Sequence, residues 1–243
     1  MCEEQPLTKF PEDFTETTTD NGTHQFTEAS KPGTRELHKP ALMYYAIFLS
    51  VIGSLGNIMT VTALCNSSSL RRQTTTWFTL SLSISDFLFS VIALPFTAFR
   101  HAGLTWVKDS SWCQLGPFIY YGSVTCSIIT ITTITINRYI RIVHFHLYHR
   151  VFTYRKTTLV IIGIWILSYG FMIPALLGIW GKFAYIASYK SCYLRADKSG
   201  RSPRTMMILL QIIVPVITTI MCYIAILYHV VKARKALRRC QSR

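Results

Sequence analysis

A few polar side chains interrupt the long apolar stretches of this sequence, and they are the residues whose chemistry could matter. Asp86 is the only acidic residue inside such a stretch. An ionised carboxylate in apolar surroundings is costly unless another group pairs with it. We therefore expect Asp86 to face other protein groups and either to bind a cation or, as a neutral acid, to hydrogen-bond with Asn57.

A second polar group, Asn137-Arg138-Tyr139, closes another apolar stretch. The long side chain of an arginine at such a boundary can reach the interface and keep its charge in water. Alternatively, Arg138 serves a functional contact there. Asn137 can hydrogen-bond but carries no charge, so it cannot form an ion pair with its neighbour.

The composition excludes several classes of protein. The chain has 243 residues, is 50% hydrophobic and 15% charged, and has a mean hydropathy of +0.32. Soluble domains contain about 25% charged residues, so a soluble enzyme, a disordered regulator and a coiled coil all fit poorly. The sequence shows no phosphate-binding loop, dinucleotide-binding fingerprint or catalytic triad, and we expect no enzymatic activity. The net charge of +14 is scattered over loops, so we expect no nucleic-acid partner.

Five apolar stretches are long enough to cross a membrane, which takes about 20 helical residues. Because lipid offers the backbone no hydrogen-bond partners, each stretch is expected to be a helix. The third is rich in Ser, Thr and Ile, but hydroxyls in a bundle can bond to a helix backbone or a neighbour. We predict an all-α integral membrane protein whose spans are 42–65, 77–99, 113–140, 157–180 and 206–231.

The polar ends of the chain complete the predicted organisation. Residues 1–41 are rich in Thr, Glu and Asp, show no secretory signal and are predicted to be a disordered tail. Asn21 lies in a glycosylation acceptor if this tail is extracellular. Residues 232–243 form a basic tail or the start of an inner loop. With the N-terminus outside, 13 Lys and Arg residues lie inside and 12 outside, so loop charge alone barely decides the orientation.

One set of residues, taken in order along the chain, resembles the rhodopsin-like (class A) G-protein-coupled receptors. The set comprises Asn57, Asp86, Cys113, Asn137, Arg138, Tyr139, Trp165, Cys192, Pro215 and Tyr223. The run 137–140 and the segment 174–183 are most similar to the Trapped-in-endoderm and Moody group, and more distantly to melatonin receptors. The resemblance covers about residues 42–235. It implies the first five helices of a seven-helix bundle, truncated after the fifth, with the N-terminus outside.

The resemblance also implies roles inside the bundle. It makes Asp86 a sodium-binding acid with Ser127 as second ligand and Asn57 as neighbour, and oxygen ligands suit such a hard cation. It makes Arg138 the activation switch, flanked by Asn137 and Tyr139 and acting together with Pro215 and Tyr223. Most of the wider family has an acid at the position of Asn137, so we expect a weaker lock and higher basal activity here. Trp165 is assigned a structural role.

Toward the outside, the resemblance implies a disulfide and a ligand pocket. Cys113 and Cys192 would pair and tie the long outer loop to the third helix. The pocket would be lined by Tyr120, Tyr121, Val124, Thr125, Met207 and Gln211. Amine-binding members have an Asp where this chain has Tyr120, so we do not expect a biogenic amine as ligand. The alternative is that these side chains only pack against other helices.

The sequence therefore predicts an orphan receptor in the plasma membrane that passes an extracellular signal to a heterotrimeric G protein, as a fragment inactive alone. Membrane lipids and a second receptor are further expected partners. The alternative is a five-span form that binds full-length receptors and inhibits them.

Overall fold

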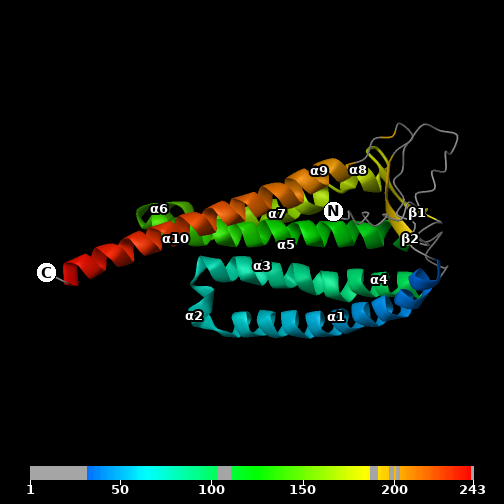
Figure 1. Ribbon diagram of the computed structural model, residues 1–243, viewed down its shortest axis with the longest axis horizontal. Helices are drawn as coiled ribbons and strands as arrows, with labels where there is room; N and C mark the ends of the chain where they lie inside the picture. The colour runs from blue at the N-terminus through cyan, green and yellow to red at the C-terminus, as the bar shows by residue number, and fades with distance from the viewer. Residues whose placement is uncertain (1–31, 103–110, 187–190, 197–199, 201–202, 242–243) are drawn as a thin grey trace, which may run out of the picture.

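The computed structural model describes residues 32–102, 111–186, 191–196, 200 and 203–241. Long helices lie side by side along one axis, and a short β-hairpin covers one end of them (Figure 1). Five helical segments within the described residues are long and apolar enough to cross a membrane, as the sequence predicts. They are Pro40–Asn66, Thr74–Phe99, Trp112–Val143, Tyr154–Leu176 and Arg204–Gln241.

The first span and its connection to the second consist of two helices. Helix α1 runs over Pro32–Asn66 and the short helix α2 over Ser68–Arg71. The prediction of a disordered tail up to residue 41 is therefore wrong for its last ten residues. Proline fits the first turn of a helix, and a helix that already exists grows by one residue at little cost. Helix α1 can thus extend outward from its apolar part.

The second and fifth spans share an irregularity. The second comprises α3 (Thr74–Leu88), the π-helical segment η1 (Phe89–Ala93) and α4 (Leu94–His101). The fifth comprises α9 (Arg204–Met207), the π-helical segment η4 (Ile208–Ile213) and α10 (Val214–Gln241). The residue after each π segment donates its N–H to the carbonyl five residues back, and a proline, Pro95 or Pro215, comes next. Since proline lacks the N–H and crowds the preceding turn, the wider turn accommodates it.

Helix α5 (Trp112–Val143) is the third span and lies at the centre, packing against α3, α7 and α10. Its threonines satisfy their hydroxyls on its own backbone. Thr125 and Thr130 each donate a 2.7 Å hydrogen bond to the carbonyl four residues back. This is why a Thr-rich stretch is helical here, as predicted.

The loop after α5 and the fourth span follow as α6 (Phe145–Val151), α7 (Tyr154–Gly170) and α8 (Ile173–Leu176). The end of the bundle at α6 is called the inner end, and the opposite end the outer end. The predicted span reached residue 180, but the long helix ends at Gly170. The ring of Pro174 would clash with the carbonyl of Gly170, four residues earlier, in a continuous helix. Gly122 of α5 allows close contact with α7, because a Cβ added there would lie 2.5 Å from the ring of Tyr169.

The outer loop forms an antiparallel hairpin of β1 (Lys182–Ile186) and β2 (Ser191–Arg195). The sequence pattern predicts no strand in this loop. The helical prediction holds for the bundle, and the hairpin is an addition at its end. Phe183 and Leu194 are cross-strand partners and are both buried against Met172, Ala175 and Met207. The hairpin thereby has one face packed on the helices and one face turned away from them.

Helix α10 continues to Gln241, ten residues beyond the predicted end of the fifth span. Figure 1 shows this end projecting past the other helices. The residues from Val231 to Gln241 are all exposed. Lys and Arg are good helix formers, so a basic segment outside the apolar region remains helical.

Candidate functional site

Asp86 lies where α3 faces α5, and its carboxylate is held by a hydroxyl of the facing helix. The Ser127 hydroxyl donates a 2.5 Å hydrogen bond to Oδ1 of Asp86. The same hydroxyl lies 3.4 Å from that of Ser85, which is fully buried and 3.3 Å from the carbonyl of Ser123. Ser85 was not among the residues predicted for this site, although its place next to Asp86 in a Ser-rich run was a usable signal. The three side chains form a group of oxygen atoms between two helices.

Asn57 does not take part in this group. Its amide donates a 2.9 Å hydrogen bond to the carbonyl of Gly53 in its own helix. Among the described residues, Asp86 therefore has Ser127 as its partner, and the hydrogen bond expected between Asp86 and Asn57 is not formed. The physical reason is local, since a carbonyl one turn back in the same helix is always within reach of an asparagine.

At the inner end of α5, Asn137 and Arg138 have opposite environments. Asn137 is fully buried and accepts a 3.0 Å hydrogen bond from the Thr75 hydroxyl of α3. Arg138 is exposed, and none of the described side chains forms an ion pair or hydrogen bond with it. The buried residue ties α5 to α3, while the charged one is available to a partner.

Neighbouring residues hold the inner loop against this end. The Tyr139 hydroxyl lies 3.2 Å from Nε2 of His144. Thr74 and Tyr148 bring their hydroxyls within 2.6 Å of each other. The guanidinium of Arg141 lies over the Tyr148 ring, 5.7 Å from its centroid. The loop that follows the Asn-Arg-Tyr run is therefore fixed to both α3 and α5.

Two of the predicted switch residues lie on the fifth span. Pro215 is buried and is the second residue after η4, and Tyr223 on α10 is 48% exposed. Among the described residues, no hydrogen bond joins Tyr223 to Arg138. The role that the resemblance implies for Tyr223 therefore stays a prediction.

The outer end of α5 is joined to the hairpin by the disulfide expected from the resemblance. The sulfur atoms of Cys113 and Cys192 are 2.04 Å apart, and their Cα atoms are 5.3 Å apart. Both cysteines are buried, and Phe96 and Tyr185 pack around them. The disulfide fixes β2 to the start of α5.

The predicted pocket residues gather below this hairpin, but three of the six are buried. The Thr125 hydroxyl lies 2.9 Å from the side-chain amide oxygen of Gln211, and this polar contact joins α5 directly to η4. Met207 belongs to the hydrophobic cluster under the hairpin. These side chains therefore pack between the helices and under the hairpin, whereas the resemblance implied that they would contact a ligand.

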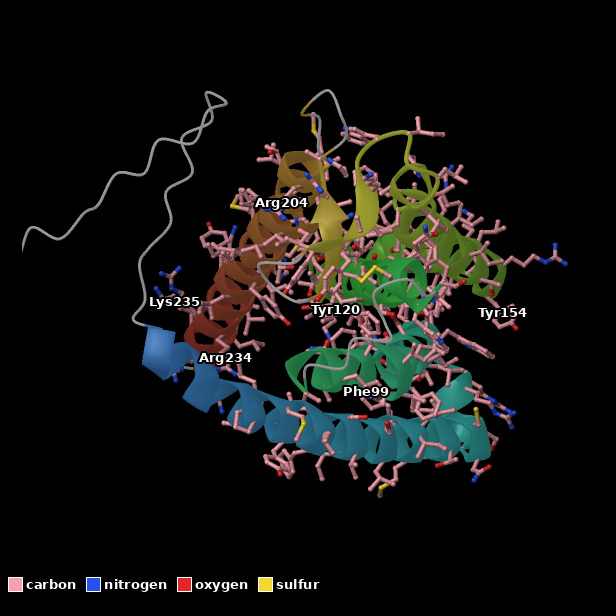
Figure 2. The ribbon with its side chains drawn as sticks, turned by 90° about the vertical axis from the view of Figure 1, so that its right-hand side faces the viewer. Phe99, Tyr120, Tyr154, Arg204, Arg234 and Lys235 are labelled. Atoms are coloured by element: carbon pink, nitrogen blue, oxygen red, sulfur yellow. A yellow bond between two sulfur atoms is a disulfide. The ribbon has the colours of Figure 1, made fainter. Side chains whose placement is uncertain are left out.

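The other three, Tyr120, Tyr121 and Val124, are partly exposed. Tyr120 is 38% exposed, and its ring packs against those of Phe89 and Tyr121. Tyr121 stacks on Phe183 of the hairpin, with ring centroids 6.3 Å apart. Viewed from the hairpin end, Tyr120 lies toward the interior of the bundle, whereas Tyr154 lies at its edge (Figure 2).

Trp165 joins the fourth span to the second and third. Its indole N–H donates a 2.9 Å hydrogen bond to the Ser81 hydroxyl, and its ring stacks on that of Tyr169. The Tyr169 hydroxyl lies 2.9 Å from that of Ser123. These contacts fit the structural role predicted for Trp165. The predicted glycosylation acceptor Asn21 lies outside the described residues.

The bundle of long apolar helices is that of a multi-pass membrane protein. Its third span carries a disulfide to the outer loop at one end and the exposed Arg138 at the other. The chain belongs to the 7 transmembrane receptor (rhodopsin family), which matches residues 56–243. This confirms the resemblance on which the site was predicted.

Similar proteins support this assignment. The chain is 36% identical over 199 residues to "G-protein coupled receptor moody" of Drosophila melanogaster, covering 82% of the chain and 29% of that receptor. It is 35% identical over 187 residues to "Protein trapped in endoderm-1" of the same species, covering 77% of the chain and 47% of that protein. The chain therefore spans less than half the length of these two relatives.

The fold has a counterpart among solved structures. The crystal structure of squid rhodopsin aligns with a TM-score of 0.70 and 21% sequence identity, covering 90% of this chain and 65% of that one. At this level of identity the likeness concerns the fold. It places the five spans in the arrangement of a rhodopsin-type bundle.

Proposed function

We propose that the protein is a receptor in the plasma membrane, with its N-terminus outside, that passes an extracellular signal to a heterotrimeric G protein. The observation that carries this proposal is the construction of α5. Its 32 residues span about 48 Å at 1.5 Å per residue. Its outer end is bonded to the hairpin through Cys113, and its inner end presents the exposed Arg138.

The geometry suggests how a signal would cross the membrane. A ligand that contacts the hairpin or Tyr120 changes the packing at the outer end of α5 and of η4, which Thr125 and Gln211 join. Movement of α10 against α5 then alters the inner surface around Arg138. Asn137 cannot hold Arg138 by an ion pair, so the inactive state depends on the hydrogen bond to Thr75 and on packing.

The ligand class follows from the outer residues. A small cationic amine needs a carboxylate as counter-ion, and Tyr120 offers a phenol instead. Tyr120, Tyr121 and Phe89 form an aromatic group that is only partly exposed. We propose a ligand that is not a biogenic amine and that uses aromatic contacts.

A sodium ion at Asp86 is part of the proposal. The donor set fits a hard cation, because a carboxylate and the hydroxyls of Ser127 and Ser85 lie together. Asp86 and Ser127 would hold the ion, which would neutralise the carboxylate between α3 and α5. Asn57 is left out, since its amide is used within α1.

Membrane lipids are further partners in this proposal. The inner ends of α2 and α7 carry the exposed residues Arg71, Arg72, Arg155 and Lys156, next to the edge-to-face ring pair of Trp77 and Tyr154. Basic residues near the cytoplasmic leaflet gain about 1 kcal/mol each from anionic headgroups. Tryptophan and tyrosine favour the same interface.

The proposal is tested by G-protein activation in cells that express the protein from its own gene. The variant Arg138→Ala is compared with Arg155→Ala, which removes an exposed arginine from the start of α7. We expect Arg138→Ala to abolish G-protein dissociation, measured with subunit reporters, at equal surface display, and Arg155→Ala to retain it. Equal signalling by the two variants would refute the role of Arg138, and so would absence of any G-protein response in the unmodified protein.

A further inference from the structure

The hairpin places two like charges directly opposite each other. In the register of the two strands Lys182 is the partner of Arg195, and both side chains are exposed. Like charges at directly opposite positions destabilise a pair of strands. We call Lys182 and Arg195 the outer basic pair. Its presence suggests that an anionic group normally lies against it.

The pair faces away from the helices. Side chains alternate between the two faces of a strand, and the neighbours Phe183 and Leu194 are buried on the bundle side. Neither strand nor α9 contains an acidic residue. Among the described side chains, none forms an ion pair with Lys182 or Arg195.

The local backbone keeps Lys182 and Arg195 at opposite positions of the two strands. Gly181, just before β1, has a φ of +70°, which favours glycine. A Cβ added there would lie 3.0 Å from the carbonyl oxygen of Arg195 and 2.9 Å from Pro203. On the other side of β2, Arg204 donates a 3.4 Å hydrogen bond to the carbonyl of Leu194. The start of β1, the end of β2 and the start of α9 are therefore packed together, and the backbone positions of Lys182 and Arg195 cannot easily separate.

The chain itself contains the matching anion. Residues 1–31 include seven acidic residues and two lysines, a net charge of −5, whereas residues 181–205 include six basic residues and one acid. Helix α1, to which this segment is joined, begins at the same end of the bundle as the hairpin (Figure 1). Thirty-one residues can span up to about 100 Å at 3.3 Å each, which is ample.

From this charge complementarity we propose that the acidic N-terminal segment 1–31 docks on the outer basic pair. A segment tethered nearby acts at an effective concentration on the order of millimolar. Because exposed ion pairs are individually weak, several of them would have to act together to populate the docked state, and the net charge of −5 on the segment allows this. Docking would cover the side of the hairpin that faces away from Met172, Ala175 and Met207.

Photo-crosslinking in the full chain tests this proposal. The photoreactive residue p-benzoylphenylalanine replaces Phe14, which lies next to Asp13 and near Glu12 and Glu16. We expect the main intramolecular cross-link, mapped by mass spectrometry, to join position 14 to peptides within 181–205. The yield is expected to fall when the salt concentration rises from about 0.1 M to about 1 M, as the Debye length shortens from about 10 Å to about 3 Å.

Charge-neutralising variants identify the partner surface. Lys182→Gln with Arg195→Gln is expected to lower the cross-link yield about fivefold, as the loss of two weak exposed ion pairs predicts. The matched control, Arg234→Gln with Lys235→Gln, removes the same charge from the exposed far end of α10 and should leave the yield unchanged (Figure 2).

The complementary change is made in the segment itself. Glu12→Gln, Asp13→Asn and Glu16→Gln together should reduce the cross-link yield to a similar degree. Because this variant does not change the hairpin, it tests the proposal even if the double variant at Lys182 and Arg195 fails to fold. A cross-link to other parts of the protein, or a yield that neither salt nor the outer variants reduce, would overturn the proposal. A yield lowered equally by the α10 control would overturn it too, because it would indicate a general charge effect.

Discussion

Thr75 and Asn137 join the inner ends of α3 and α5 through a single hydrogen bond of 3.0 Å, in which the threonine hydroxyl donates to Oδ1 of the amide. Asn137 is fully buried, and its Nδ2 has no partner among the described residues. The residue beside the exposed Arg138 is thus held by one neutral bond.

Removing that bond should destabilise the helix pair. In Thr75→Val the buried amide loses its remaining partner, and an unsatisfied buried polar group costs about 1–3 kcal/mol. We expect a lower unfolding temperature in detergent. Thr79→Val is the matched control, because the Thr79 hydroxyl only bonds to the carbonyl of Thr75 in its own helix. Equal loss of stability in the two variants would contradict the importance of the contact between helices.

Adding a charge at the same place should strengthen the inactive state. Asn137→Asp gives Arg138 an adjacent carboxylate, and a hydrogen bond to a charged group contributes about 1.5–3 kcal/mol. Ligand-independent G-protein activation should therefore fall about tenfold or more. Unchanged ligand-independent activation in Asn137→Asp, at equal surface display, would contradict this effect of the added carboxylate.

Sodium binding at Asp86 predicts an ion-specific stabilisation. Sodium at about ten times its dissociation constant would stabilise the folded protein by about 1.4 kcal/mol. The unfolding temperature in sodium chloride should exceed that in choline chloride of the same ionic strength. Asp86→Asn keeps the size of the side chain but removes its charge, and should abolish the difference. A sodium effect of the same size in the variant would exclude this carboxylate as the ligand.

The contact between α5 and α7 predicts a steric effect at Gly122. The methyl group of Gly122→Ala would lie 2.5 Å from the Tyr169 ring, so the helices must shift. Overpacking of this kind costs about 1–3 kcal/mol. Gly163→Ala on α7 is the control, because a Cβ there meets nothing within 4 Å. Thermal unfolding should separate the two, and an unchanged Gly122→Ala would mean that Tyr169 moves freely.

The sequence by itself determined the five spans, because hydropathy and length are local properties that lipid imposes on each helix separately. It also singled out Asp86 and Arg138, since a charge within or at the edge of an apolar stretch is visible without coordinates. The cysteine pair came from the resemblance, and the disulfide between Cys113 and Cys192 bears it out.

Only the tertiary structure decided which polar groups meet. Asn57 bonds within its own helix rather than to Asp86, and Thr125 bonds to Gln211 rather than facing an open pocket. Both outcomes depend on how facing helices are rotated, which no local pattern encodes. The opposition of Lys182 and Arg195 likewise depends on strand register. That register is set by the burial of Phe183 and Leu194 against the bundle, because a slip of one residue would turn those side chains to the solvent.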